Sequence, residues 1–256
     1  MSINIKSILP IGLLTLSSSI FAGSMGENSL NYAGIWAGVG GGYINTFTNG
    51  HTDITMISTT ISPQEYLLDK NLENHFAPVA NAGYRFNLPN NWLIGVKGVY
   101  KYVGVEQFDQ SWAGTFQNGT YQSAGLHTKI NDVTFLTLDG GYQFGSWLVY
   151  GGAGPSLTRV SEQLNGDLLP PTSFVLQPVN ITQSKLFLGG AGQVGFEYML
   201  PNRFMIDVSY NLVVSGNSKM PNLYFQSGTA NNYTLFSQQV QVVEQGVNIT
   251  INKFFM

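Results

Sequence analysis

The chain has 256 residues, of which 13% are aromatic and only 10% are charged, against roughly 25% charged residues in an average soluble domain. This low charge, together with 30 glycines, favours a protein whose outer surface does not face water. A net charge of −3 argues against nucleic acid as a partner, because nucleic-acid binding requires a basic face, and the absence of cysteine excludes disulfides and thiolate metal sites.

The first element in the chain is a predicted secretory signal peptide over residues 1–22. Lys6 supplies a positive start, an apolar stretch follows over residues 8–16, and Ala22 ends a segment typical of a cleavage site. The apolar stretch is too short for a membrane-spanning helix; the alternative is a buried N-terminal helix. We therefore expect a single mature domain over residues 23–256, with a net charge near −4 after the loss of Lys6.

Eight later segments alternate between apolar and polar residues with a period of two, which predicts strands that have two different faces. These segments cover residues 32–47, 76–86, 92–104, 130–144, 147–157, 184–198, 204–214 and 240–255. In residues 204–214, for example, Ile206 and Val208 alternate with Asp207 and Ser209. After residue 22 no apolar run is long enough for a membrane helix, so the chain is either soluble or crosses a membrane as a closed barrel.

A short phrase occurs three times, in copies about 55 residues apart that begin at Gly83, Gly141 and Gly195. Each copy reads as the end of one strand, a tight turn and the start of the next strand, with aromatic residues on both sides of the turn. Such a repeat predicts a repeated unit, here an antiparallel hairpin. The aromatic girdle predicted at this end consists of Tyr84, Phe86, Trp92, Tyr142, Phe144, Trp147, Phe196, Tyr198 and Phe204.

The connections between the predicted strands alternate in length. Those near residues 88–90, 145–146 and 200–202 have the size of turns. The others are expected to be structureless loops of more than twenty residues, over residues 48–75, 106–129, 160–183 and 215–239. Compact soluble domains seldom carry such loops, whereas membrane barrels combine short periplasmic turns with long extracellular loops.

The sequence resembles the small outer-membrane barrels of Gram-negative bacteria, the family that includes the OmpA membrane domain, OmpX and the opacity proteins. The resemblance rests on the glycine-rich residues 33–43, on the three hairpin phrases and on the C-terminal strand, and it covers nearly all of the mature chain. It implies an all-β fold, namely an eight-stranded antiparallel up-and-down transmembrane β-barrel in the outer membrane. It also implies a structural or surface-interaction role, adhesin-like or in serum resistance.

The C-terminal strand looks like the insertion signal of this family, an alternating strand closed by an aromatic residue that the barrel-assembly machinery reads. The matching positions are Gly246, Ile249, Ile251, Phe254 and Phe255. Met256 follows the aromatic pair and departs from the pattern, so either phenylalanine is a candidate for the residue that is read. Lys253 falls on the outward face near the periplasmic edge, where its amine can reach lipid headgroups.

Charged residues on the predicted inward faces form a candidate cluster in the lumen. They are Arg85, Lys97, Lys101, Asp139, Glu197 and Asp207. We expect Lys97 and Asp139 at similar heights, and Glu197 close to Asp207 with Arg85 or Lys97 as the cation between them. An eight-stranded barrel is just wide enough for side chains to fill. One interpretation is a salt-bridged plug that closes the lumen; the alternative is a constriction that gates a narrow pore.

Candidate catalytic groups are sparse, and we predict neither enzymatic activity nor a cofactor or metal. The three histidines, His51, His75 and His127, lie in or beside the predicted long loops. A nucleophile needs a base within hydrogen-bond reach, and the only local combinations are His127 with Ser123 and His51 with Asp53. Neither resembles the arrangement of the barrel deacylases, and no metal, phosphate-loop or dinucleotide motif is present.

The predicted long loops are the remaining functional candidates, because loops on a rigid scaffold often carry function. The first loop is acidic, and the loops contain the aromatic residues Trp112, Phe116, Tyr121, Tyr224, Phe225 and Tyr233. We expect outer-membrane lipid, lipopolysaccharide and the barrel-assembly machinery as partners, together with an extracellular protein ligand, and no nucleic acid. The alternatives are a narrow porin-like channel for small solutes and a secreted soluble barrel, which would have to expose a continuous apolar belt.

Overall fold

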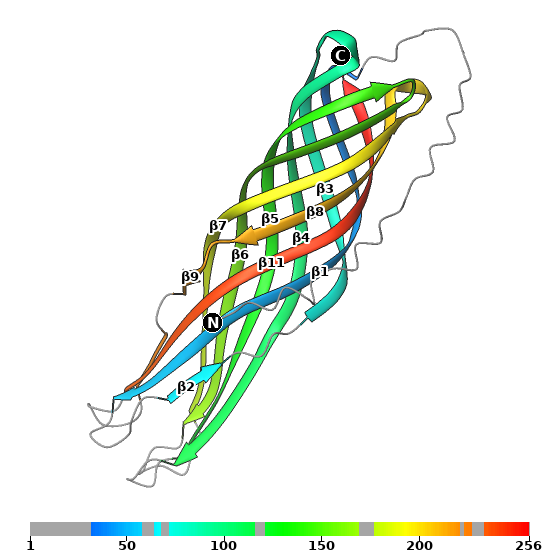
Figure 1. Ribbon diagram of the computed structural model, residues 1–256. Helices are drawn as coiled ribbons and strands as arrows, with labels where there is room; N and C mark the ends of the chain where they lie inside the picture. The colour runs from blue at the N-terminus through cyan, green and yellow to red at the C-terminus, as the bar shows by residue number, and fades with distance from the viewer. Residues whose placement is uncertain are drawn as a thin grey trace.

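The computed structural model describes residues 32–57, 64–67, 72–115, 121–168, 177–220, 223–226 and 233–255. These residues form one antiparallel sheet that closes on itself (Figure 1). Its long strands are β1 (Gly34–Ile57), β3 (Leu72–Asn87), β4 (Trp92–Thr115), β5 (Tyr121–Phe144), β6 (Trp147–Leu168), β7 (Gln177–Met199), β8 (Phe204–Ser215) and β11 (Tyr233–Phe255). The short strands are β2 (Gln64–Leu67), β9 (Ser218–Lys219) and β10 (Leu223–Gln226).

Each long strand pairs with the next one along the chain, and β11 pairs with β1 to close the ring. The predicted eight-stranded up-and-down barrel is therefore confirmed. The predicted signal peptide over residues 1–22 lies outside the described residues. No helix in the described part of the chain has the length and the apolar character needed to cross a membrane.

All three short connections lie at one end of the barrel. Two are 3-10 turns over Pro89–Asn91 and Pro201–Arg203, and the third is the two-residue turn at 145–146. Asn90 and Gly145 take left-handed backbone angles, with φ of 60° and 61°, which these two residue types adopt more readily than most others. The short turns predicted from the sequence are thus present.

The long connections are not the structureless loops that the sequence suggested. Most of the residues assigned to them belong to strands: β4 continues to Thr115, β5 begins at Tyr121, and β6 continues to Leu168. Beyond the bilayer, the outward face of a strand meets water in place of lipid, so an apolar outward face is no longer required and the alternation of apolar and polar residues weakens. The backbone hydrogen bonds continue nonetheless, so the strands extend beyond the residues in which the sequence alternates.

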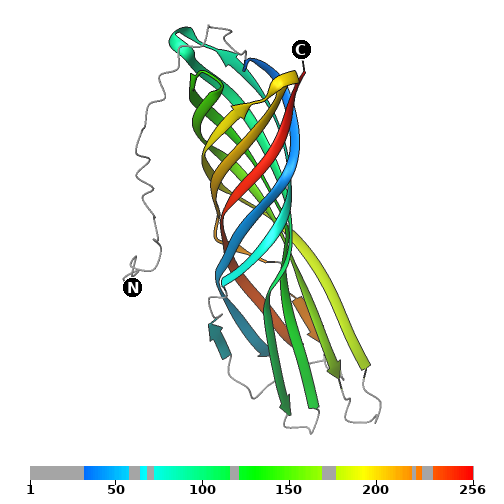
Figure 2. The same cartoon turned by 90° about the vertical axis from the view of Figure 1, so that its right-hand side faces the viewer.

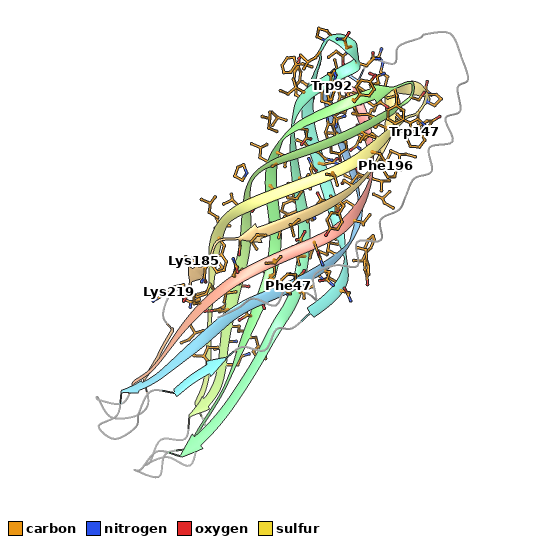
Figure 3. The ribbon with its side chains drawn as sticks, viewed as in Figure 1. Phe47, Trp92, Trp147, Lys185, Phe196 and Lys219 are labelled. Atoms are coloured by element: carbon orange, nitrogen blue, oxygen red, sulfur yellow. The ribbon has the colours of Figure 1, made fainter. Side chains whose placement is uncertain are left out.

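An apolar belt surrounds the barrel next to the short turns (Figure 3). On β6 it begins at Trp147, includes Val149 and Leu157, and gives way to Arg159. About ten residue steps along a strand tilted by about 40° span roughly 25 Å, the height of the apolar band of an outer-membrane barrel. The belt therefore matches a bilayer, and the long strand extensions lie on its extracellular side.

On the extracellular side of the belt, at the lower end of the barrel in Figure 2, the ring opens into two sheets. The pairing of β3 with β4 ends at Val79 and Lys101, and that of β7 with β8 ends at Gly189 and Ser215. Strands β4 to β7 continue as one sheet. Strands β1 and β11 continue as a second sheet, to which β2, β9 and β10 are added.

Candidate functional site

The lumen of the barrel contains a polar layer between two apolar layers. The layer near the short turns consists of Tyr32, Trp36, Leu93, Leu148, Met199, Met205 and Phe254. The layer on the extracellular side includes Ile44, Val99, Phe135, Val160, Phe187 and Val242. All six charged residues singled out from the sequence are buried inside the barrel, each with 4% exposure or less. Burial of a charge is costly unless the charge is paired, so the partners of these residues decide what the site can do.

Arg85 of β3 and Glu197 of β7 form an ion pair with two parallel hydrogen bonds. Arg85 Nη1 donates to Glu197 Oε2 at 2.5 Å, and Nη2 donates to Oε1 at 2.6 Å. This two-point geometry is the strongest that an arginine makes with a carboxylate. The guanidinium also lies 5.1 Å from the ring centre of Trp36 and 5.6 Å from that of Tyr150, so aromatic faces cover the charge that the carboxylate leaves uncovered.

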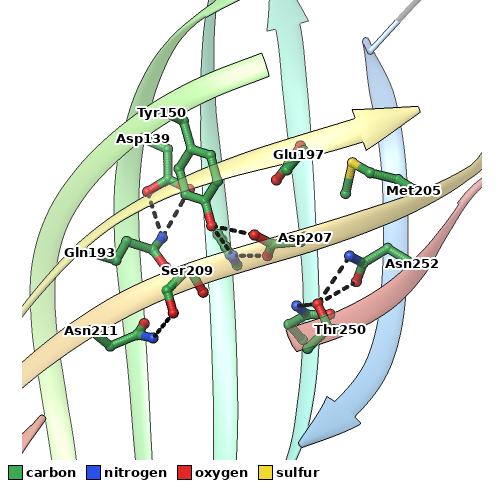
Figure 4. A network of polar contacts seen from close by, with 12 residues as sticks. Asp139, Tyr150, Gln193, Glu197, Met205, Asp207, Ser209, Asn211, Thr250 and Asn252 are labelled. Carbon is green, nitrogen blue, oxygen red and sulfur yellow. Dashed lines mark hydrogen bonds and ion pairs between the residues drawn. The ribbon is translucent and has the colours of Figure 1, made fainter. Parts of the chain in front are cut away.

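Lys97 of β4, Asp207 of β8 and Tyr150 of β6 form a second group (Figure 4). Lys97 Nζ donates to Asp207 Oδ2 at 2.6 Å and to the Tyr150 hydroxyl at 2.7 Å. The Tyr150 hydroxyl in turn donates to Asp207 Oδ1 at 2.8 Å. Glu197 lies directly opposite Asp207 in the register of β7 with β8, and each of these two carboxylates has its own cation.

Asp139 of β5 has a neutral partner. Gln193 Nε2 donates to its two carboxylate oxygens at 2.8 Å and 3.1 Å (Figure 4). The same nitrogen lies 2.6 Å from Thr137 Oγ1. Although Asp139 lies opposite Gly95, two residues from Lys97, the amine of Lys97 reaches Asp207 instead. A cavity of about 10 Å³ beside Asp139 is also lined by Arg85 and Tyr150, which is room for about one water molecule.

Lys101 pairs with a carboxylate that the sequence-based cluster omitted. Its amine donates to Glu244 Oε1 of β11 at 2.5 Å and lies 5.5 Å from the ring centre of Phe135. In the sequence, the only sign that Glu244 belongs to the lumen is its place in the alternation of the last strand, which directs its side chain inward. Tyr150 and Gln193 were omitted in the same way, because neither is charged and both become important only through residues on other strands.

Small residues on β1 make room for this polar layer. A Cβ atom at Gly38 would collide with the side chain of Asn252 and the carbonyl oxygen of Ile251, and one at Gly42 would collide with the side chain of Asn248. Both asparagines belong to β11, the neighbour of β1. The glycine-rich start of the barrel therefore serves close packing against polar side chains of the closing strand.

The predicted girdle residues lie on the outer surface close to the short turns, where Figure 3 labels Trp92, Trp147 and Phe196. Trp92 packs edge-on against Tyr142 of the neighbouring strand, with 5.4 Å between the ring centres. Trp147 packs at a tilt against Phe196 and Tyr198, with 6.1 Å and 4.7 Å between the ring centres. Such rings suit the boundary between hydrocarbon and headgroups.

The two terminal phenylalanines occupy opposite faces of β11. Phe255 is 51% exposed on the outer surface, where Ile249 and Ile251 are also exposed. In contrast, Phe254 is buried and packs edge-on against Tyr32. At Gly246 a Cβ atom would collide with the carbonyl oxygen of Tyr43. Of the two candidates for the residue read during insertion, Phe255 therefore continues the outward apolar series. Lys253 also faces outward, and its amine lies 5.4 Å from the ring centre of Phe204.

Of the two histidine combinations named from the sequence, the structure bears only on His127 with Ser123. Ser123 and His127 lie four residues apart on β5, so their Cα atoms are separated by about 13 Å, which is beyond direct hydrogen-bond reach. His51 and Asp53 lie on β1, and their side chains are outside the described part of the structure. No group of three acidic, histidine or cysteine residues that could hold a metal occurs among the described residues.

Comparisons with known proteins connect this barrel to a family. The family model described as the outer membrane protein beta-barrel domain matches residues 16–242. No curated protein matches the chain.

Among solved structures, the chain is similar to Ail, the attachment invasion locus protein of Yersinia pestis, with 14% identity over 83% of this chain and 98% of that one and a TM-score of 0.34. OprG from Pseudomonas aeruginosa has 16% identity over 87% of this chain and 97% of that one, with a TM-score of 0.45. The outer membrane protease OmpT from Escherichia coli has 8% identity with the same coverage and TM-score.

Proposed function

Because the chain belongs to the outer-membrane β-barrel domain family and lies in the outer membrane, we propose that it is a surface-interaction protein without enzymatic activity. The extracellular strand extensions carry the contact surface for a host or matrix protein, in an adhesin-like or serum-resistance role. The membrane-embedded part is a rigid support. Outer-membrane lipid, lipopolysaccharide and the barrel-assembly machinery are the further partners that this role implies.

The observation that supports this proposal is the contrast between the lumen and the extracellular strands. The lumen is filled by buried ion pairs between apolar layers. In contrast, β4 and β5 remain paired from Glu106 and Lys129 out to Thr115 and Tyr121. Long paired strands outside the bilayer provide a large and rigid surface there. A rigid surface loses little conformational entropy on binding.

The test compares the intact barrel with variants that lack one extracellular hairpin. A two-residue Asn-Gly turn replaces residues 107–128, which joins the directly opposed Glu106 and Lys129 with a turn favoured in hairpins. A matched variant replaces residues 164–181, which joins Gln163 to Thr182 on β6 and β7. Both variants retain the belt and the lumen, so heat-modifiable gel mobility should be unchanged.

Cells that display each protein are then measured for adhesion to immobilised fibronectin and laminin and for survival in serum. We expect the intact chain to raise at least one of these readouts, and at least one hairpin replacement to abolish the gain. The proposal is wrong if the intact chain raises neither readout, or if both replacements leave the gain unchanged.

The alternative function is a narrow channel for small solutes. It requires an open path through the lumen, and the cavity beside Asp139 holds about one water molecule. Planar bilayers containing the purified barrel separate the two functions. Discrete conductance steps would favour the channel, whereas silent bilayers together with hairpin-dependent binding would favour the surface-interaction protein.

A further inference from the structure

A short segment bridges the extracellular opening that β8 leaves between β7 and β11. Strand β8 ends at Ser215, and the next residues, 216–220, which we call the strap, contain β9. Strand β9 pairs with β11, and Met220 at the end of the strap is buried in the extracellular apolar layer of the lumen. The strap therefore covers a part of the barrel wall in which β8 is missing.

Two hydrogen bonds join the strap to β7 in the part of the chain that the structure describes. The Gly216 N–H donates to the carbonyl oxygen of Leu188 at 2.7 Å. Lys185 Nζ donates to the carbonyl oxygen of Lys219 at 2.5 Å, and Figure 3 shows these two lysines next to each other. The second bond comes from a side chain, so a movement of Lys185 alone is enough to break it.

The lumen face of β7 brings Lys185 close to a buried carboxyl group on β6. Lys185 lies opposite the buried Val160, and Glu162 lies opposite Gln183. Glu162 and Lys185 are therefore diagonal neighbours on the inner face of two adjacent strands, with Cβ atoms about 7 Å apart, which a long side chain can span. Lys185 nevertheless has no carboxylate within ion-pair distance among the described residues.

Glu162 has a single hydrogen bond and no cation among the described residues. Its side chain is buried; Oε2 accepts the bond from Gln183 Nε2 at 3.1 Å, and Oε1 has no hydrogen-bond partner there. Burial raises the pKa of this carboxyl from 4.5 to about 7, against the effect of the bond from Gln183. Glu162 is therefore a neutral acid in mildly acidic medium and a carboxylate in alkaline medium.

Three other ionisable side chains face the extracellular part of the lumen in the described residues, namely Lys101, Glu244 and His75. Lys101 of β4 and Glu244 of β11 pair with each other. On the neighbouring strand β5, the residue opposite Glu162 is the neutral Thr128. Among the described lysines and arginines that face the lumen, Lys185 is thus the one that is not paired with a carboxylate.

We propose that the charge on Glu162 controls the strap, because Lys185 can bind either the carbonyl oxygen of Lys219 or the carboxylate of Glu162. While Glu162 is protonated, Lys185 stays on the carbonyl oxygen and holds the strap against β7. Once Glu162 is ionised, a buried carboxylate without a cation is costly, so it draws the amine away from the strap. The strap is therefore held at low pH and released at high pH.

Release of the strap opens the barrel wall between β7 and β11. The carbonyl oxygen of Lys219 then binds water, since this residue is exposed. Because the strap loses one of its contacts, the new ion pair offsets only part of the cost of ionising Glu162. The inference goes beyond the proposed surface interaction and does not depend on it.

The test measures the distance between the strap and β7 by double electron–electron resonance. The chain has no cysteine, so Ser184→Cys on β7 and Asn217→Cys in the strap, both at exposed positions, can be spin-labelled without further changes. With the barrel in lipid vesicles, we expect a short and narrow distance distribution at pH 5 and a longer and broader one at pH 8. Heat-modifiable gel mobility checks that each variant is folded.

Three variants in this labelled background identify the groups that act. Glu162→Gln should keep the short distance at both pH values, because its side chain cannot become a carboxylate. Lys185→Met should give the longer distance at both pH values, because the strap has lost the amine that holds it. His75→Gln is the matched control, since it removes another ionisable group that faces the lumen, and it should respond to pH as the wild-type chain does.

The inference is overturned if the distance in the wild-type chain is the same at both pH values, or if Glu162→Gln still responds to pH. It is also overturned if Lys185→Met keeps the short distance, or if His75→Gln abolishes the response. None of these measurements involves adhesion or serum survival, so they bear on the strap and leave the proposed function to its own test.

Discussion

Arg85 of β3 and Glu197 of β7 meet inside the barrel as a doubly hydrogen-bonded ion pair, although their strands are not neighbours in the sheet. The pair therefore ties opposite walls of the lumen together. Because both side chains are buried, removal of one leaves the other charge without compensation.

We predict that Glu197→Gln lowers the free energy of unfolding by about 3–5 kcal/mol. Unfolding in urea, followed by tryptophan fluorescence of the barrel in lipid vesicles, measures the change. The double replacement Arg85→Met with Glu197→Leu should recover most of the loss, because an apolar pair of similar volume avoids the desolvation of two charges. A double variant less stable than Glu197→Gln would contradict this account.

Asp139 should be less sensitive than Glu197. Its partner is the amide of Gln193, and an asparagine can still offer one oxygen to that amide. We predict that Asp139→Asn destabilises the barrel by about 1 kcal/mol. The same urea measurement compares the two variants, and a loss as large as that of Glu197→Gln would show that Asp139 compensates a cation through the adjoining cavity.

Glu162 makes the stability of the barrel dependent on pH. It lies on β6 beyond Arg159 and thus outside the belt, is 2% exposed, and accepts one hydrogen bond of 3.1 Å from Gln183 Nε2. Burial raises the pKa of its carboxyl from 4.5 to about 7, although the hydrogen bond from Gln183 opposes the change. The folded state therefore favours the protonated carboxylic acid.

A raised pKa of an acid stabilises the folded state at low pH, and that stability is lost as the pH rises from about 4.5 to 7. We predict that the wild-type chain loses roughly 3 kcal/mol over this window relative to Glu162→Gln. The two proteins should differ little at pH 4, and the variant should be the more stable at pH 8. Urea midpoints at both pH values provide the measurement; parallel pH profiles would refute the prediction.

Two glycines provide a matched test of packing. At Gly40 of β1, a Cβ atom would collide with backbone atoms of Ile249 and Thr250, whereas at Gly140 of β5 a Cβ atom would meet nothing within 4 Å. We predict that Gly40→Ala destabilises the barrel by about 1–3 kcal/mol, and that Gly140→Ala changes the stability by less than about 0.5 kcal/mol. Heat-modifiable gel mobility as a function of temperature compares them, and equal midpoints would contradict the packing argument.

Much of the architecture could be predicted from the sequence because the signals for it are local. The alternation of Ile206 and Val208 with Asp207 and Ser209 assigns each side chain to one face of its strand, whatever the neighbouring strands are. The tight turns after Phe86, Phe144 and Tyr198 likewise need only the residues that form them. The extracellular parts of the strands could not be predicted in the same way, because their outward face meets water in place of lipid and the alternation of apolar and polar residues weakens there.

The partners inside the lumen, in contrast, were decided only by the tertiary structure. Sequence parity directs Lys97, Lys101 and Glu244 inward, but it does not place Lys97 on Asp207 or Lys101 on Glu244. Those contacts depend on how far each strand is staggered against the next around the closed ring, and the stagger accumulates over strands that are distant in the chain. The direction of a side chain is thus a property of its own strand, whereas its partner is a property of the closed barrel.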